Sequence, residues 1–246
     1  MSRGTPSGTG PTRVALEVAG GELPAYRWEP EGPARAGLVV FQEIFGVSDY
    51  VRSRCADLAA LGYLVLAPEL YWRLEASGVD TTVDEQRPDF LERAMGLAGQ
   101  LDWAAAVEDG VATVERLRSE RGVERVGVLG FCFGGGLAFN VAARTGVDAL
   151  VSYYGSALPT LLELAPSVTA PSLHHFGTDD AFIDAAAVER IRDAVTGPHA
   201  GAGTGLELHE GAGHAFDNPH PAFHHPEASA RAWEQTRAFL TAHLPT

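Results

Sequence analysis

The sequence predicts an α/β fold, in which a mostly parallel central sheet carries helices on both faces and an antiparallel hairpin at its N-terminal end. Short, continuously apolar runs, typical of strands buried on both faces, alternate with longer segments of helical periodicity. Residues 13–28 alternate apolar and polar side chains around Gly20 and Gly21, which is typical of a hairpin. A glycine-flanked turn at Gly130–Gly136 separates an apolar run from a helical run, as in a sharp strand-to-helix turn.

The remaining elements follow in order along the chain. Strands are expected, after the hairpin, at 38–41, 63–67, 125–129, 149–155, 172–177 and 206–210. Helices are expected at 49–61, 102–121, 137–144, 183–195 and 227–243. Ser48 and Asp102 are the predicted N-caps of the first two helices. The segment 69–100 looks irregular and charged, and a connection of this length in a compact domain is usually functional or mobile.

Length and composition describe one domain. The chain has 246 residues, of which 46% are hydrophobic, so residues 13–246 are expected to form a single domain after a disordered tail at 1–12. No apolar run is long enough to predict a membrane span, and the first residues do not resemble a secretory signal.

Charge and cysteine content narrow the classes of partner. The net charge of −14 argues against nucleic acid, since a polyanionic backbone would be repelled. It also means that an anionic substrate would need a local arginine. The two cysteines, Cys55 and Cys132, are too few for a disulfide framework, which favours a reducing cytoplasm. We expect a monomer or a homodimer that acts on a small molecule.

Cys132 lies at the apex of the glycine-flanked turn. Gly130 and Gly134 stand two residues before and after it, where a β-carbon would clash in so sharp a turn. The start of a helix favours negative charge, so the thiolate is favoured at this position. The spacing therefore indicates a nucleophile, whereas a cysteine without this context would more often be a buried structural residue. Cys55, on the apolar face of the first helix, is predicted to be such a core residue.

A reactive thiol needs a base and an orienting acid, and α/β-hydrolases place them after the nucleophile in the order acid, then histidine. Strand 206–210 is followed by Gly211-Ala212-Gly213-His214, so His214 is the predicted base. Strand 172–177 is followed by Thr178-Asp179-Asp180, and Asp180 fits the acid better than Asp179, with Asp184 a weaker third candidate.

The other histidines are expected to have ordinary roles. His174 and His175 lie within a predicted strand, where at most one could face the site. His220, His224 and His225 cluster near Asp217, but their spacing is not that of a trusted metal motif, and we expect a solvated loop. No metal or organic cofactor is expected.

Glu43 directly follows a wholly apolar strand, where a carboxylate is costly unless it has a role. Position alone leaves open that it is an exposed loop residue. In this fold the loop after that strand supplies one N–H group of the oxyanion hole, here that of Ile44, and the residue after the nucleophile, Phe133, supplies the other.

Several motifs together resemble the dienelactone hydrolase family of the α/β-hydrolase superfamily. The resemblance runs from about Val14 to Leu240, and although each motif is weak alone, the ordered set is specific. The motifs are Gln42–Gly46, Ala67–Tyr71, Gly130–Gly135, Phe176–Asp180 and Gly211–Phe216. One departure is Glu69, which stands where the family more usually has an aspartate.

The resemblance implies a function and a set of roles. Cys132, His214 and Asp180 would form a catalytic triad, with Glu43 in contact with the thiol. Reference members hydrolyse dienelactone to maleylacetate and hold the substrate carboxylate with arginine. Arg73, Arg87 and Tyr71, all in the segment 69–100, are the candidates for substrate binding here.

We therefore expect hydrolysis of a lactone or ester through a thioester on Cys132. Two alternatives remain at this stage. One is a broader carboxylesterase or thioesterase with an unrelated acyl substrate. The other is a hydrolase-fold protein that senses thiol chemistry without turnover.

Overall fold

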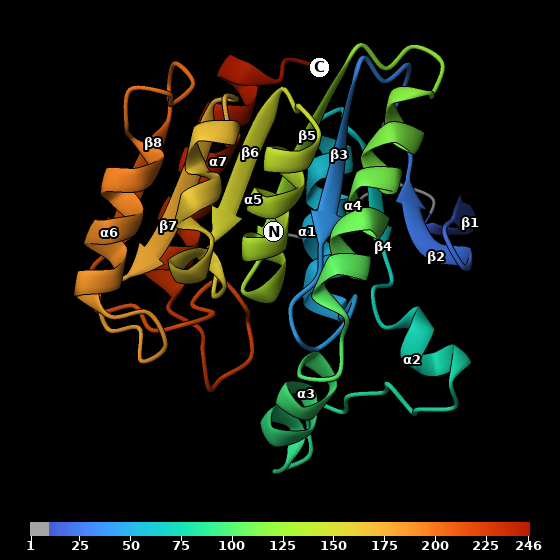
Figure 1. Cartoon of the computed structure of the whole chain (residues 1–246), viewed down its shortest axis with the longest axis horizontal. Coiled ribbons are helices and arrows are strands. Elements are labelled where there is room, and N and C mark those ends of the chain that lie inside the picture. The colour runs from blue at the N-terminus through green and yellow to red at the C-terminus, as the bar shows by residue number, and fades with distance from the viewer. Residues whose placement is uncertain (1–9) are drawn as a thin grey trace, which may run out of the picture.

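A computed structural model describes residues 10–246 and contains one eight-stranded sheet (Figure 1). The strand order is β1-β2-β4-β3-β5-β6-β7-β8. Pairs β1–β2 and β2–β4 are antiparallel and all other pairs are parallel. The predicted α/β-hydrolase fold, with its antiparallel N-terminal strands, is confirmed. The strands are β1 Thr12–Val18, β2 Gly21–Trp28, β3 Ala36–Phe41, β4 Leu64–Pro68, β5 Arg125–Phe131, β6 Ala149–Tyr153, β7 Ser172–Gly177 and β8 Gly205–His209.

Helices cover both faces of the sheet. In Figure 1, α4, α5 and α6 lie in front of it, while α1 and α7 lie behind. The helices are α1 Asp49–Ala60, α2 Trp72–Ala76, α3 Phe90–Ala98, α4 Trp103–Arg118, α5 Phe133–Arg144, α6 Ala185–Val195 and α7 Pro226–His243. Two short 3-10 helices, Leu158–Thr160 and Leu162–Ser167, lie between β6 and β7. No helix within residues 10–246 has both the length and the apolar character needed to cross a bilayer.

The apolar runs form the core because helices pack on both sides of them. Every residue of β3, β4, β6 and β7 is buried, which explains why these strands are continuous rather than alternating in the sequence. The hairpin strand β1 keeps its alternation because one of its faces is exposed. Cys55 is fully buried in this core, as predicted.

Four expectations about local structure meet different outcomes. Asp102 caps α4 by accepting a hydrogen bond from the Ala105 N–H. Ser48 precedes α1, but its side chain makes no capping hydrogen bond.

The prediction that 69–100 is irregular is wrong in part, because the segment contains α2 and α3. Helix α3 buries Ala94 and Leu97, a spacing of three residues that indicates an amphipathic helix. The tail predicted at 1–12 falls mostly outside the described residues, and β1 already begins at Thr12.

The turn between β5 and α5 depends on two glycines without side chains. A β-carbon at Gly130 would lie 1.9 Å from the Gly134 carbonyl oxygen. A β-carbon at Gly134 would lie 2.4 Å from the Phe41 carbonyl oxygen, on the neighbouring strand β3. Both distances are far below van der Waals contact, so the turn can approach β3 only with glycine at these two positions.

We predict that Gly130→Ala destabilises the protein by at least about 3 kcal/mol, because the added carbon clashes with rigid backbone rather than with a flexible side chain. The melting temperature should fall by roughly 6–12 °C for a chain of this size, as measured by thermal unfolding. Gly146→Ala is the matched control, since a β-carbon there meets nothing within 4 Å. Equal melting temperatures for the two variants would contradict this account of the turn.

Candidate active site

Cys132 occupies the apex of the turn in a strained conformation. Its backbone has φ 53° and ψ −114°, and it is the N-cap residue of α5. A positive φ is uncommon for a residue with a side chain and marks positions that the surrounding structure holds in place. The N–H groups of Gly135 and Gly136 donate to the Cys132 carbonyl oxygen, whereas the first turn of a helix leaves its first N–H groups, here those of Phe133 and Gly134, without intrahelical partners.

Cys132, His214 and Asp180 form one chain of hydrogen bonds. The Cys132 Sγ lies 3.1 Å from the His214 Nε2, and the His214 Nδ1 lies 2.7 Å from the Asp180 Oδ2. His214 follows β8 and Asp180 follows β7, so both loops leave the carboxyl edge of the sheet, next to the turn. Three residues far apart in the sequence therefore meet because parallel strands end at the same edge.

The structure separates the three aspartates that the sequence left in competition. The Asp180 Oδ1 accepts hydrogen bonds from the Phe182 N–H at 2.8 Å and the Ile183 N–H at 3.1 Å, which turns Oδ2 toward His214. Asp179 is exposed and accepts only from the Thr178 hydroxyl. Asp184 caps α6 through the Ala187 N–H.

Burial and hydrogen bonding act in opposite directions on His214. Burial alone would lower the pKa of its imidazole, but hydrogen bonds to Asp180 and Cys132 raise that pKa to about 10. The protonated ring is thus held between a carboxylate and a sulfur. This arrangement suits a group that takes and returns protons beside a nucleophile.

Glu43 is fully buried, which excludes an exposed loop position. Its Oε1 accepts a hydrogen bond from the Tyr154 hydroxyl at 3.3 Å, and its Oε2 accepts one from the Asn218 side chain at 2.8 Å. The Cys132 sulfur points to His214 instead, so the expected hydrogen bond between Glu43 and the thiol is not made in this conformation. Burial raises the pKa of Glu43 to about 7, against the lowering effects of Asn218 and His214.

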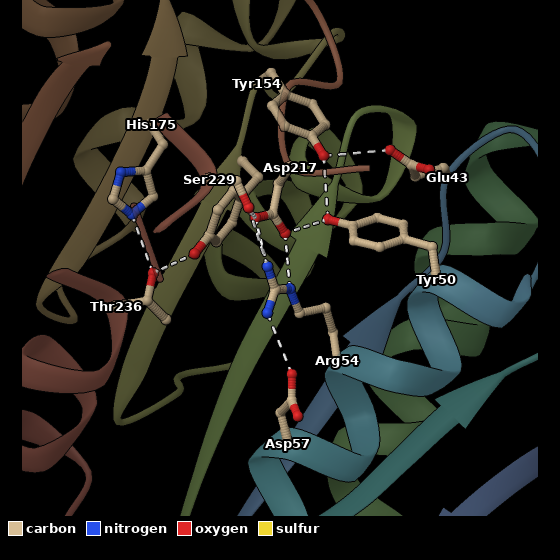
Figure 2. Close-up of polar contacts among 10 residues, drawn as sticks. Glu43, Tyr50, Arg54, Asp57, Tyr154, His175, Asp217, Ser229 and Thr236 are labelled. Atoms are coloured by element: carbon tan, nitrogen blue, oxygen red, sulfur yellow. Dashed lines mark hydrogen bonds and ion pairs between the residues drawn. The ribbon is translucent and has the colours of Figure 1, made fainter. Parts of the chain in front are cut away.

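A buried polar network continues from Glu43 away from the thiol (Figure 2). The Tyr154 hydroxyl lies 3.2 Å from that of Tyr50, which donates to the Asp217 Oδ2 at 2.6 Å. Asp217 also accepts from the Arg54 guanidinium, at 2.6 Å and 2.8 Å, and is fully buried at its side chain. The Arg54 guanidinium compensates the charge of the buried Asp217 carboxylate. The hydrogen bonds that Glu43 accepts come instead from neutral groups, the Tyr154 hydroxyl and the Asn218 amide.

Sequence reasoning did not find this network. Asp217 and Asn218 closely follow His214, and Tyr154 ends a predicted strand at a positive φ of 39°. For these three residues, the signal available in the sequence was their position beside other residues of the site. Nothing in the sequence shows that Tyr50, on α1, bridges two of them.

The oxyanion-hole candidates lie on either side of Cys132. Phe133 begins α5, so its N–H belongs to the unpaired first turn. Ile44 lies in the loop after β3, and the Tyr71 hydroxyl donates to its carbonyl oxygen at 2.8 Å. Tyr71 thus lies beneath this loop and borders a neighbouring cavity of about 480 Å³ rather than the one at Cys132.

The two arginine candidates lie elsewhere. Arg73 pairs with Asp109 on α4 and stacks over the Trp72 ring. Arg87 pairs with Asp89. Neither arginine is among the residues around the cavity that contains Cys132, so the structure does not bring them to the sulfur.

Three other histidines named from the sequence, His174, His175 and His225, lie outside the chain of bonds that contains Cys132. Burial lowers the pKa of His174 to about 4, and His175 bonds to Thr236 and His209 within the core (Figure 2 shows the Thr236 contact). His225 caps α7. Among residues 10–246 no group of three or more His, Cys, Asp or Glu side chains could hold a metal ion.

A cavity of about 610 Å³ opens beside Cys132 and His214. Its walls come from the loop after β3, the start of α5, the loops after β7 and β8, and helix α3. Phe90 of α3 packs against Phe45 and Phe223, with ring centroids 5.7 Å and 6.0 Å away, which holds the helix over the site. The segment expected to be an irregular loop thus supplies one wall of the cavity.

Known proteins share both the sequence pattern and the fold. The chain is 34% identical to carboxymethylenebutenolidase 1 of Cupriavidus pinatubonensis over 80% of this chain and 82% of that protein. It is 36% identical to a carboxymethylenebutenolidase of Pseudomonas putida over 85% and 87% of the two chains. A dienelactone hydrolase structure from Anabaena variabilis has a TM-score of 0.69 at 20% identity and covers 96% of this chain and 100% of its own, which shows the shared fold.

The family assignment rests on nearly the whole domain. Residues 23–244 match the family model described as the dienelactone hydrolase family. This span contains Glu43, the Cys132 turn and both loops that carry Asp180 and His214. The chain therefore belongs to the dienelactone hydrolase family and is a hydrolase.

Proposed function

We propose that the protein hydrolyses a carboxylic ester or lactone through a thioester on Cys132. The observation that carries this proposal is the hydrogen-bonded chain from Cys132 through His214 to Asp180 beside an open cavity. Relatives named carboxymethylenebutenolidase support a lactone as one substrate class. Both cysteines are free, which agrees with the cytoplasm as the location we propose.

The first half of the proposed reaction forms the thioester. The Cys132 thiolate attacks the ester carbonyl, and the N–H groups of Ile44 and Phe133 stabilise the oxyanion, each contributing about 3 kcal/mol. The tetrahedral intermediate then expels the alcohol oxygen, which takes a proton from the His214 imidazolium. In a lactone this oxygen stays tethered to the acyl chain.

The second half releases the product. His214, now neutral, takes a proton from water as that water attacks the thioester, and the thiolate leaves. Asp180 holds the ring so that the Nε2 faces the sulfur throughout. We propose that Glu43 receives the thiol proton before the first attack and returns it to the thiolate after the product leaves, since a pKa near 7 allows a buried carboxyl group to exchange a proton at neutral pH.

Cys132→Ala, His214→Ala and Asp180→Asn are each expected to lower kcat for p-nitrophenyl acetate by at least about 10³-fold, because the three groups act as a unit. Intact-mass measurement of rapidly quenched wild-type reactions should show one acetyl group on Cys132. Activity retained in both Cys132→Ala and His214→Ala would refute the assignment. A thiol that alkylates rapidly but gives no turnover would favour the thiol-sensing alternative.

Two matched controls accompany these variants. Cys55→Ala removes the other cysteine, which is buried in the core away from the cavity. Asp184→Asn removes a nearby carboxylate, and asparagine caps a helix as well as aspartate does. Both controls should retain kcat within about twofold, since neither touches the reacting groups.

Glu43→Gln should make stability less dependent on pH. The folded-state pKa of about 7 exceeds the ordinary value of 4.5, so the contribution of this group is complete below about pH 4.5 and is lost as the pH rises through about 7. Relative to wild type, the variant should therefore gain about 3 kcal/mol, or roughly 6–12 °C in melting temperature, between pH 5 and pH 8. Glu234→Gln, at an exposed position on α7, should show no such gain. If the melting temperatures of wild type and Glu43→Gln changed equally with pH across this range, the burial argument would be contradicted.

A further inference from the structure

The walls of the cavity at Cys132 are mostly apolar and aromatic. The side chains that form them include Ile44, Leu91, Met95, Phe133, Phe182 and Phe223. They come from five separate parts of the chain, so the apolar surface surrounds the sulfur rather than covering one side of it.

Two of these side chains are unusual for their exposure. Met95 on α3 is 52% exposed and Phe182, after β7, is 62% exposed. Only Leu208 joins them as a large, exposed hydrophobic side chain among residues 10–246. Phe182 also packs edge-on against the His214 ring, with centroids 5.0 Å apart. Apolar groups kept in water at the rim of a reactive cavity are a physical sign of an apolar ligand.

Within residues 10–246 no arginine lines this cavity, and the chain contains no lysine. The ionisable side chains around it other than Cys132 and His214 are two carboxyl groups, Glu43 and Asp179, and the imidazoles of His224 and His225. The His225 Nδ1 accepts the Ala228 N–H, so this ring is occupied as the cap of α7. A permanent cation that could pair with a substrate carboxylate is thus missing among the described residues at this site.

We propose that this enzyme selects uncharged, apolar acyl groups and discriminates against substrates that carry a carboxylate on the acyl chain. The inference rests on the proposed ester hydrolysis at Cys132 and specifies its substrate class. A carboxylate on the acyl chain would lose hydration in this cavity without gaining an arginine or lysine partner, and it would meet the carboxyl groups of Glu43 and Asp179. An alkyl or aryl chain would instead cover Met95 and Phe182 and remove apolar surface from water.

The test compares two p-nitrophenyl esters that differ only at the far end of the acyl chain. The hexanoate ends in a methyl group, and the mono-ester of adipate ends in a carboxylate. We expect kcat/KM for the hexanoate to exceed that for the adipate by at least about tenfold after subtraction of the uncatalysed rates. Equal values, or a preference for the adipate, would overturn the inference.

A cation introduced at the rim should reverse part of this preference. Met95→Arg places a guanidinium beside the apolar wall, and the ratio of kcat/KM for adipate over hexanoate should rise by at least about fivefold. Met95→Gln is the matched control, because it removes the apolar side chain without adding charge, and it should leave adipate disfavoured. An unchanged ratio in Met95→Arg would show that charge in this cavity does not decide selection.

The preference for apolar groups can also be tested by alkylation of the Cys132 thiol, which requires no turnover. N-hexylmaleimide and maleimidohexanoate differ by the same methyl-to-carboxylate exchange, at a distance from the reacting carbon. Modification of Cys132 should be at least about tenfold faster with the hexyl reagent, relative to the ratio measured on glutathione, and Cys132→Ala should show no fast phase. If neither ester is hydrolysed, the proposed hydrolysis fails and this ratio alone decides the selectivity. If both esters are hydrolysed and adipate is preferred, the hydrolysis stands and only the substrate class is overturned.

Discussion

The close approach between the Cys132 turn and strand β3 is the contact on which the rest of the site depends. With glycine at positions 130 and 134, the backbone of α5 passes so near the Phe41 carbonyl that no β-carbon fits between them. This approach forces a positive φ on Cys132 and lifts its sulfur out of the sheet toward the loop that carries His214. It also brings Gly134, in the first turn of α5, next to the Gln42 carbonyl group at the start of the loop that carries Glu43. A looser turn would move the Cys132 sulfur away from the His214 imidazole.

The two carboxyl groups of the site differ because their surroundings differ. Asp180 receives two backbone N–H groups on one oxygen and His214 on the other, so its charge is fully compensated. Glu43 is more deeply buried and receives only a phenol and an amide, and burial raises its pKa to about 7. The strong cation nearby, Arg54, is engaged by Asp217 instead. One fold thus holds a carboxylate with a complete set of donors and a second carboxyl group that can exchange its proton near neutral pH.

Family membership and substrate class come from different parts of the chain. The sulfur, imidazole and carboxylate lie on loops at the carboxyl edge of the sheet, and the positions of these loops are determined by strand pairing. Part of the cavity wall comes from α3 and from loop side chains such as Phe182 and Phe223, which the strand pairing does not constrain. Selection among acyl groups can therefore change in this family while the reacting groups stay in place.

The sequence by itself determined the fold class, the order of the strands along the chain and the α-helices other than α2 and α3, and it predicted Cys132, His214 and Asp180 as site residues. It could do so because buried parallel strands are continuously apolar and because a sharp turn admits only glycine two residues from its apex. Tertiary structure alone decided which Asp180 oxygen meets His214, that Glu43 bonds Tyr154 and Asn218 rather than the thiol, and that Arg73 pairs with Asp109. It also decided that α3, within a segment that looked irregular, becomes a wall of the cavity. These outcomes depend on side-chain direction and on contacts between elements distant in the chain, and neither is contained in local pattern.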